Sequence, residues 1–419
     1  MWDPYAEFET ATLPNGLTVY AAHWPGRPWE AMGFLIHSGA EHDPIGCEGA
    51  AHFVEHLISD NAGMPKKDVK DFFESHGGDV DLGHTSWHRT RYQFWMPTDP
   101  AVFSQALTIF GNGLLSAKLD KFVERERQVI IGEFHRYYVH QITYDLALRE
   151  RKALYNGYWL ERTVRPLGYP ESISRITQSD LQRFYDTHYT PANMSVVGVG
   201  GLTLQELVRF LSESPFAVRK EGTRTQLPAP ATDIAAPSET RYVFELSQHL
   251  KTEMPFQVAA YKTVAVMPTG KETIAVKMLQ EMLSDALNEE VRESRALTYH
   301  IGSSFYDHRH FYEFAIDCSR LEVRALDGIE GIVEACIGSM HDRTDLFENK
   351  KRNGLAARFM VDPKARDLCE GATDELASHQ KISSLAEDAR EIAELTMDDV
   401  RGLLRWLKPE RRWTVITKP

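Results

Sequence analysis

Cysteine is scarce in this chain of 419 residues, and its four copies never form a Cys-x-x-Cys pair. Cys47, Cys318, Cys336 and Cys369 therefore match neither a thiolate zinc site nor the disulfide framework of a small secreted protein. We interpret them as buried or neutral thiols in a reducing compartment, which favours a cytoplasmic location.

The chain also lacks a surplus of basic residues and a long apolar run. Its 47 Lys and Arg against 60 Asp and Glu give a net charge of -13, whereas nucleic-acid-binding proteins usually need a basic surface. No run approaches the roughly 18 apolar residues that a membrane span requires, and the N-terminus has no signal-peptide pattern. No phosphate-binding loop motif is present either. We therefore expect no nucleic acid, nucleotide or membrane span among the protein's partners.

The length itself is too great for one ordinary hydrophobic core, so two or more domains are expected. Residues 216–238 are rich in proline, alanine and small polar residues and show no helical or strand period. This segment is typical of a surface linker. It divides the chain into an N-terminal domain, residues 1–215, and a C-terminal domain, residues 239–419.

The two sides of the linker resemble each other. ITQSDLQRFYDTHYTPANMSVVGVG begins at Ile176, and LTMDDVRGLLRWLKPERRWTVITKP begins at Leu395. Each has a threonine three residues before an aspartate, as at a helix N-cap, then a short amphipathic stretch, a proline and a β-branched strand. The threonine, aspartate and proline pairs are Thr177 and Thr396, Asp180 and Asp399, and Pro191 and Pro409. This shared order predicts an internal duplication.

Strand and helix patterns interleave, and short turns join several neighbouring strands. Pro14-Asn15-Gly16 marks a hairpin between two alternating stretches. We predict an α+β protein with two homologous domains, each a mostly antiparallel sheet flanked by helices. The predicted helices are 49–59, 66–76, 99–118, 120–141 and 272–294, and the later strands are 239–247, 257–267, 299–306 and 311–318.

The stretch AHFVEHL, residues 51–57, contains two histidines and a glutamate that could form part of a metal site. His52 and His56 are four residues apart, so on a helix they lie on one face and could bind one metal ion. Glu55 lies beside them, where its carboxylate could take a proton from metal-activated water. The pattern H-x-x-E-H inverts a known zinc motif. Alone, it leaves an ordinary amphipathic helix equally open.

A third ligand is available in VERERQVIIGEFHRYY. Glu126 and Glu133 are seven residues apart, two helical turns, and so share a face. Glutamates on helices are usually solvated, which is the alternative interpretation. We expect apolar side chains to anchor this helix in the protein, namely Phe122, Val129, Ile130 and Phe134.

These motifs together resemble the M16 family of zinc metallopeptidases, the pitrilysin-like or inverzincin group, in its two-domain, mitochondrial-processing-peptidase-like class. The family pairs H-x-x-E-H with a more distant glutamate, and here 76 residues lie between His56 and Glu133. TLPNGLTVY and RPLGYPESISRITQSDLQRFYDTHYTPANMSVVGVG extend the similarity over nearly the whole chain. The resemblance implies an M16-like metallohydrolase fold and one Zn²⁺ per chain, bound by His52, His56 and Glu133. It also implies that Glu55 is the general base and that Glu126 supports a ligand.

The second half supplies a further match, because Arg292 and Tyr299 have the spacing of the family's arginine–tyrosine pair. The resemblance implies that this pair binds substrate carbonyls and stabilises the oxyanion. Without the family, a surface arginine and a core tyrosine would be the simpler interpretation. One departure concerns the strand expected to pair with substrate, where Leu82 and Gly83, followed by His84, replace the family's Asn-Ala.

The resemblance implies a zinc endopeptidase that cleaves short or unfolded peptides inside a dimeric chamber. The dimer could be a homodimer or a heterodimer with an M16 relative. The alternative is a non-catalytic subunit that binds peptides or supports a partner peptidase. Two other candidate sites are weak: His308 and His310 have no acidic partner at a ligand spacing, and Cys47 resembles a turn cysteine more than a nucleophile.

Overall fold

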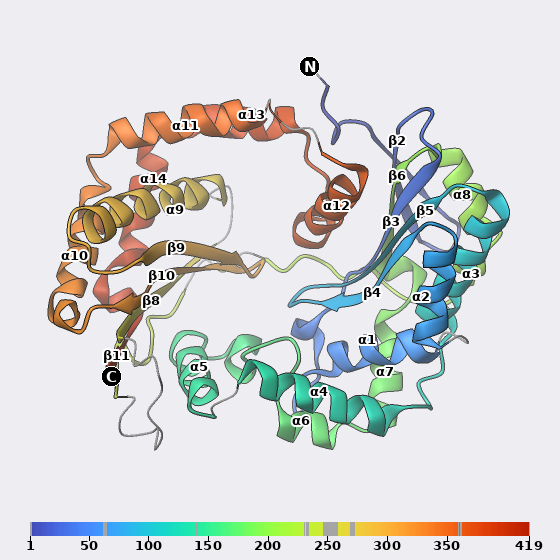
Figure 1. Cartoon of the computed structure of the whole chain (residues 1–419), viewed down its shortest axis with the longest axis horizontal. Helices are drawn as coiled ribbons and strands as arrows, with labels where there is room; N and C mark the ends of the chain where they lie inside the picture. The colour runs from blue at the N-terminus through green and yellow to red at the C-terminus, as the bar shows by residue number, and fades with distance from the viewer. Residues whose placement is uncertain are drawn as a thin grey trace. The chain divides into compact units, whose positions relative to one another are not determined.

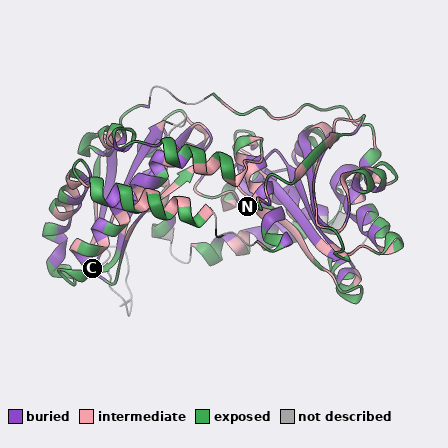
Figure 2. Ribbon diagram, turned by 90° about the horizontal axis from the view of Figure 1, so that it is seen from above, coloured by how far each residue is buried: buried purple, intermediate pink, exposed green. Residues whose placement is uncertain are grey.

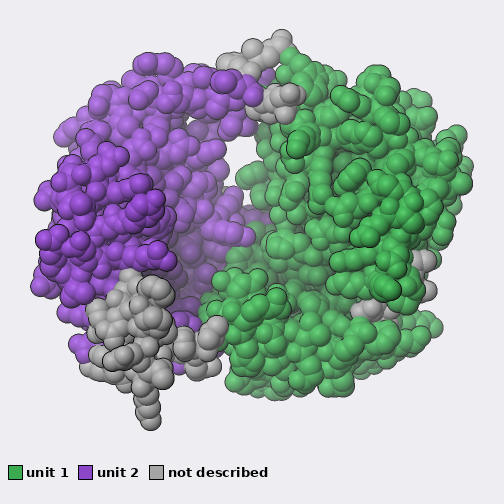
Figure 3. Space-filling model, viewed as in Figure 1, with its two compact units in different colours: residues 1–141, 163–227, 362–385 green, residues 142–162, 228–361, 386–419 purple. Residues whose placement is uncertain are grey.

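The computed structural model describes residues 2–61, 65–138, 141–229, 231, 234–245, 259–268, 273–358, 360 and 363–418. Figure 3 shows two compact units, coloured separately. Unit 1 comprises residues 1–141, 163–227 and 362–385, and unit 2 comprises residues 142–162, 228–361 and 386–419. The boundary between residues 227 and 228 falls within the expected linker. Each unit, however, also takes one segment from the other half of the chain.

Unit 1 is built on a six-stranded sheet in the order β1-β2-β6-β3-β5-β4 (Figure 1). All neighbours are antiparallel except β2 and β6. Strand β4 forms one edge of the sheet, next to β5. The strands are β1 Phe8–Thr12, β2 Thr18–His23, β3 Trp29–Ile36, β4 Asp79–Thr85, β5 Thr90–Pro97 and β6 Met194–Gly200.

Unit 2 has a five-stranded sheet in the order β7-β11-β8-β10-β9. Only β7 and β11 are parallel. This order repeats β2-β6-β3-β5-β4 of unit 1 strand for strand, including the position of the one parallel pair. The predicted duplication and the mostly antiparallel α+β fold are therefore confirmed. The strands are β7 Arg241–Glu245, β8 Ala259–Pro268, β9 His300–Asp307, β10 Phe311–Leu321 and β11 Arg412–Lys418.

Helices cover both sheets, and the sheets themselves are largely buried (Figure 2). In unit 1 the helices are α1 Ala50–Asn61, α2 Lys66–Ser75, α3 Pro100–Ser116, α4 Val123–Tyr137, α6 Pro170–Arg175, α7 Gln178–His188, α8 Leu204–Ser212 and α12 Ala365–His379. In unit 2 the helices are α5 Gln141–Leu154, α9 Thr273–Leu287, α10 Leu326–Ser339, α11 Thr344–Arg358, α13 Leu385–Glu394 and α14 Met397–Leu403. Helices α5 and α13 each begin one residue before the corresponding segment of unit 2. The two predicted capping boxes are present at Thr177–Asp180 and Thr396–Asp399.

Strand β3 shows how the unit 1 sheet is buried on both faces. Successive side chains of a strand point to opposite faces. Met32 and Phe34 enter the main core with α1 and α3, whereas Ala31 and Leu35 pack against α12. Helix α12 comes from the C-terminal half of the chain, so the second face of this sheet depends on a segment distant in sequence.

An ion-pair network in unit 2 connects α5 to the sheet. Arg151 lies 2.7 Å from Glu313 of β10, and Lys262 of β8 lies 2.7 Å from Glu150. Arg151 and Glu313 are mostly buried, so losing either partner would leave an uncompensated charge. This network explains why α5 belongs to unit 2 although it precedes the linker.

Two expectations from the sequence were wrong in detail. Phe216, at the start of the expected surface linker, is fully buried and stacks on Phe34 with 5.1 Å between ring centroids. The helix predicted over 120–141 begins at Val123, because Phe122 adopts a left-handed conformation with φ 62°. Of the four apolar residues expected to anchor it, Phe122 and Val129 are exposed. Residues 139–140, 246–247, 257–258 and 272 of the predicted elements lie outside the described residues.

Gly33→Ala should destabilise the protein by about 1–3 kcal/mol through overpacking. A Cβ at Gly33 would lie 2.7 Å from Thr373 Oγ1 and 3.3 Å from Cys369 Sγ, both on α12. Urea unfolding would measure the loss. Adding Thr373→Ala should recover much of it by removing the clashing oxygen.

Gly302→Ala is the matched control, because Gly302 also lies in a strand and its added Cβ would meet only one atom, at 3.9 Å. An equal loss from Gly33→Ala with and without Thr373→Ala would contradict the packing of α12 described above.

Candidate metal centre

Helix α1 presents His52 and His56 toward the same side. Asp43 accepts hydrogen bonds from the backbone N–H groups of Gly49 (2.6 Å) and Ala51 (2.8 Å), which fixes the start of the helix. Phe53, Val54 and Leu57 are fully buried on its apolar side. The centroids of the two imidazole rings lie 4.6 Å apart. The contacts at the start of α1 and on its apolar side therefore help to orient both histidines.

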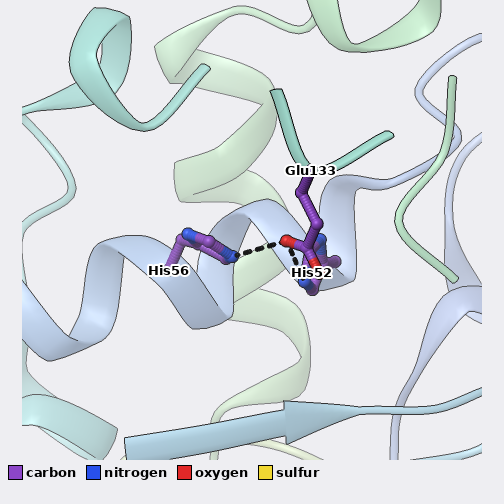
Figure 4. A group of neighbouring side chains, drawn as sticks. All are labelled: His52, His56 and Glu133. Carbon is purple, nitrogen blue, oxygen red and sulfur yellow. Dashed lines mark ion pairs between the residues drawn. The ribbon is translucent and has the colours of Figure 1, made fainter. Parts of the chain in front are cut away.

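Glu133 reaches the two histidines from α4 (Figure 4). Its Oε2 lies 3.8 Å from Nε2 of His52 and 3.7 Å from Nε2 of His56. Ligands about 2.0–2.1 Å from a tetrahedral zinc ion lie roughly 3.3 Å from one another. Two imidazole nitrogens and a carboxylate oxygen also form the donor set of known catalytic zinc sites. These three residues thus fit a zinc ion with only small adjustments.

Helix α4, which carries Glu133, is held against the rest of unit 1 by buried side chains and hydrogen bonds. Ile130 and Phe134 are buried, and Arg127 donates hydrogen bonds to the carbonyl oxygens of Ile173 and Ile176. Arg127 is only 8% exposed although it is charged. Because these contacts set the position of α4 against α6, the carboxylate of Glu133 stays within reach of α1.

The two histidines differ in their electrostatic surroundings. Burial, with the neighbouring His56, lowers the pKa of His52 to about 3. Burial also opposes a charge on His56, but the hydrogen bond to Glu126 and the nearby carboxylate of Glu133 outweigh it and raise the pKa of His56 to about 9. At neutral pH the metal-free site therefore holds one neutral and one protonated imidazole.

Glu126 contacts one of the expected ligands, His56, so a supporting role for it stays a prediction that this contact fits. Its Oε2 lies 3.0 Å from Nδ1 of His56, the ring nitrogen opposite the one that faces Glu133. Metal-binding histidines usually donate their second N–H to such a carboxylate, which fixes the ring and raises its basicity. By contrast, Nδ1 of His52 is buried and has no hydrogen-bond partner in the part of the chain that the structure describes.

Glu55 lies on the same helix but has different partners. Its Oε2 accepts hydrogen bonds from the backbone N–H (3.1 Å) and the hydroxyl (2.9 Å) of Thr85. Burial raises the pKa of the Glu55 carboxyl. No described residue donates a hydrogen bond to its other oxygen, Oε1. Thr85 therefore holds one oxygen of Glu55, whereas the other has no hydrogen-bond donor among the described residues, an arrangement that suits a general base.

Thr85 is the residue that sequence reasoning missed. It ends strand β4, which also contains Leu82, Gly83 and His84, the residues expected to contact substrate. The structure places these three on an edge of the sheet, and whether they bind substrate stays a prediction. Only the strand register brings Thr85 to Glu55, so no local sequence signal identified it.

Arg292 and Tyr299 belong to unit 2. Arg292 lies in a π-helix, Asn288–Glu293, that continues α9, and Tyr299 comes just before β9. The guanidinium carbon lies 4.9 Å from the centre of the Tyr299 ring, and Tyr299 is 78% exposed. A core tyrosine, the simpler interpretation of the sequence, is therefore wrong.

The weaker candidates have structural roles. His308 is 1% exposed and lies 3.6 Å from Glu313, and Nδ1 of His310 lies 3.0 Å from the carbonyl oxygen of Ala229. Burial raises the pKa of Cys47, which argues against a reactive thiolate. Among the described residues, only His52, His56 and Glu133 bring three metal-ligating side chains together.

Comparison with known protein families agrees with this geometry. The model described as "Insulinase (Peptidase family M16)" matches residues 18–162, and "Peptidase M16 inactive domain" matches residues 175–337. The chain belongs to the M16 peptidase family, which confirms the resemblance seen in its motifs.

Relatives in the family are peptidases by name. An uncharacterized zinc protease of Mycobacterium tuberculosis is 24% identical over 97% of this chain and 92% of its own length. The mitochondrial-processing peptidase subunit beta of Lentinula edodes is 30% identical over 50% of this chain and 44% of its own length. Matches to mitochondrial relatives cover about half of those proteins.

Solved structures share the fold. A protease from Helicobacter pylori matches with a TM-score of 0.82 at 18% identity, covering 100% of both chains. A peptidase M16 inactive domain from Pseudomonas fluorescens matches with a TM-score of 0.82 at 17% identity, covering 98% of each. In the part of the chain that the structure describes, no helix has the length and apolar character to cross a bilayer. The cytoplasmic location stays a prediction.

Zinc binding should release about one proton at pH 7, because His56 is protonated there and His52 is not. The apparent Kd should therefore tighten about tenfold per pH unit between pH 6 and 8 and level off above pH 9. Competition with a chromophoric chelator at several pH values would measure this.

Glu126→Gln provides the comparison for that experiment. It removes a carboxylate that holds the proton on His56, so the pH dependence should weaken. A zinc affinity that is independent of pH between 6 and 8 would contradict the charge states described above.

Proposed function

We propose that this protein is a zinc-dependent endopeptidase with Glu55 as its general base. The observation that supports this most strongly is the convergence of His52, His56 and Glu133 beside a carboxylate held at one oxygen. Zinc proteases among the relatives agree with it. All four residues of the site are intact, whereas a member without activity would be free to lose them.

The chemistry divides between the metal and the protein. A zinc ion held by His52, His56 and Glu133 would supply Lewis acidity toward a peptide carbonyl and toward water. Glu55 takes a proton at Oε1 from a water molecule as the water oxygen bonds to the peptide carbonyl carbon, and it passes that proton to the leaving amine as the C–N bond breaks. Glu126 keeps the ring of His56 in place through Nδ1. The protein thus contributes orientation and proton transfer at two different carboxylates.

Arg292 and Tyr299 are proposed to assist the reaction by binding substrate carbonyls and the developing oxyanion. The exposure of Tyr299 supports this, because its hydroxyl is available to a ligand. Hydrogen-bond donors aimed at a developing negative charge are often the largest single term in acyl-transfer catalysis.

We further propose that the enzyme acts on short or unfolded peptides inside a chamber formed by a dimer. Some relatives are named as a subunit beta, so those proteins are parts of assemblies. Since this chain carries both the candidate zinc site and the Arg292–Tyr299 pair, a homodimer is the simplest assembly. A heterodimer with an M16 relative is the other arrangement.

A non-catalytic subunit that binds peptides or supports a partner peptidase is the second candidate function. The family model over residues 175–337 is described as an inactive domain, and this description is the observation that supports the alternative. It differs from the enzyme in one measurable way: a binding subunit loaded with zinc would cleave no unfolded peptide.

Glu55→Gln should abolish cleavage of a quenched fluorescent peptide while leaving about one zinc per chain. Glutamine keeps the size of the side chain and can still accept from Thr85, but it cannot take a proton from water. Glu74→Gln, at an exposed site on α2, is the control and should keep full activity. If the wild-type protein binds no zinc, the enzyme hypothesis is wrong.

Tyr299→Phe should lower kcat by about 10²-fold if the hydroxyl stabilises the oxyanion. Tyr242→Phe is a matched control, because Arg149 lies 3.8 Å over the Tyr242 ring in a second arginine–tyrosine pair of unit 2. That variant should behave like wild type. An unchanged rate in Tyr299→Phe would leave this tyrosine with no part in the reaction.

A further inference from the structure

Strand β4 is irregular at the point where it passes the candidate general base. Asp81 pairs with Gln93 of β5, but the next paired residue, His84, faces Arg91. Two residues, Leu82 and Gly83, therefore stand opposite one residue of β5, which is the definition of a β-bulge. The bulge changes the direction of the strand in the stretch expected to contact substrate.

Gly83 adopts a backbone conformation and a position that a side chain would not tolerate. Its φ is +145°, a region that other residues rarely enter. A Cβ at this position would lie 2.5 Å from Cγ and 2.7 Å from Oε1 of Glu55. The absence of a side chain is therefore what lets β4 pass directly against the carboxylate of Glu55.

Thr85, two residues further on, uses this close approach. Its N–H and hydroxyl both donate to Oε2 of Glu55, at 3.1 and 2.9 Å. Two donors on one oxygen limit the rotation of the carboxylate and so fix Oε2. The other oxygen, Oε1, is the atom that a side chain at residue 83 would crowd.

We propose that the bulge at Leu82–Gly83 and the two donors of Thr85 together position Glu55 for proton transfer, an inference that rests on the proposed function. Gly83 and Thr85 are positioning residues: Thr85 holds Oε2, and Gly83 keeps Oε1 open to the attacking water. Leu82-Gly83, the departure from the family's Asn-Ala, is in this view part of how the site is built.

The first test is Gly83→Ala in the zinc-loaded protein. We expect kcat to fall by about 10²-fold, because displacing a reacting group by about 1 Å costs this much. KM should change less than about threefold. The zinc content should equal that of wild type, since the atoms nearest an added Cβ at residue 83 belong to Glu55 and not to a proposed zinc ligand. Loss of zinc, or a wild-type kcat, would overturn the proposal.

Gly77→Ala separates backbone strain from the contact with Glu55. Gly77 lies in the turn before β4, also has a positive φ (+75°), and an added Cβ there meets nothing within 4 Å. It should be destabilised by strain yet keep wild-type kcat. A fall in kcat like that of Gly83→Ala would assign the effect to strain in the strand and overturn the proposed role of residue 83.

Thr85→Val and Thr85→Ser test the second component. Valine keeps the shape but removes the hydroxyl donor to Oε2, so kcat should fall about tenfold. Serine keeps the hydroxyl and should restore kcat to within about twofold of wild type. A merely structural role would predict no such rescue, and equal kcat for the two variants would overturn the proposed role of Thr85.

A thermodynamic cycle tests the contact without any need for activity. Gly83→Ala should lower the urea midpoint of unfolding more in wild type than in a Glu55→Ala background, where the clash is gone and only the backbone strain at φ +145° remains. If wild-type protein with zinc cleaves no peptide, the proposed function fails, yet this coupling still measures the contact. Equal midpoint shifts in the two backgrounds would overturn the inference.

Discussion

The burial of four ionisable side chains in one small volume is the constraint on which unit 1 depends. Glu133, Glu126, His52 and His56 are partly or largely removed from water, and an unpaired charge there would cost several kcal/mol. The cluster is stable because each carboxylate has an imidazole partner and only one imidazole is charged. Such a site needs its two helices, α1 and α4, held at a fixed distance, and the core contacts of Phe53, Ile130 and Arg127 do this.

The second unit has the same arrangement of strands, but the helix that corresponds to α1 contributes to packing and carries no cluster of metal-ligating side chains among the described residues. Helix α9 follows strand β8 as α1 follows β3, and the two sheets have the same strand order. Where α1 carries two histidines and a glutamate, α9 buries an apolar side, with Val276, Leu279, Met282 and Leu283 enclosed in the core of unit 2. Unit 2 therefore has apolar packing on the helix that corresponds to the one carrying the polar cluster in unit 1.

How much the sequence could predict follows from the range of each interaction. His52, Glu55 and His56 share a helical turn, so their spacing was readable locally, and Glu133 followed from the family's spacing. The contacts of Gly83 and Thr85 with Glu55 could not be predicted, because a single extra residue in β4 decides which residue meets Glu55. Helices α5 and α12 were not assigned to their units, since an ion pair such as Arg151–Glu313 leaves no local pattern. Periodicity also failed at Phe216, where packing on Phe34 overrides a linker-like composition.

The bulge in β4 links this local geometry to a general problem of sheets. An edge strand presents unpaired N–H and C=O groups, and a flat edge invites pairing with any other extended chain. A bulge interrupts that row and twists the strand, so the edge accepts fewer partners. In this protein the interruption occurs where β4 meets Glu55. The bulge at Leu82–Gly83, next to the contact between Thr85 and Glu55, therefore also interrupts the row of N–H and C=O groups at this edge, so the surroundings of the Glu55 carboxylate and the geometry of the edge depend on the same two residues.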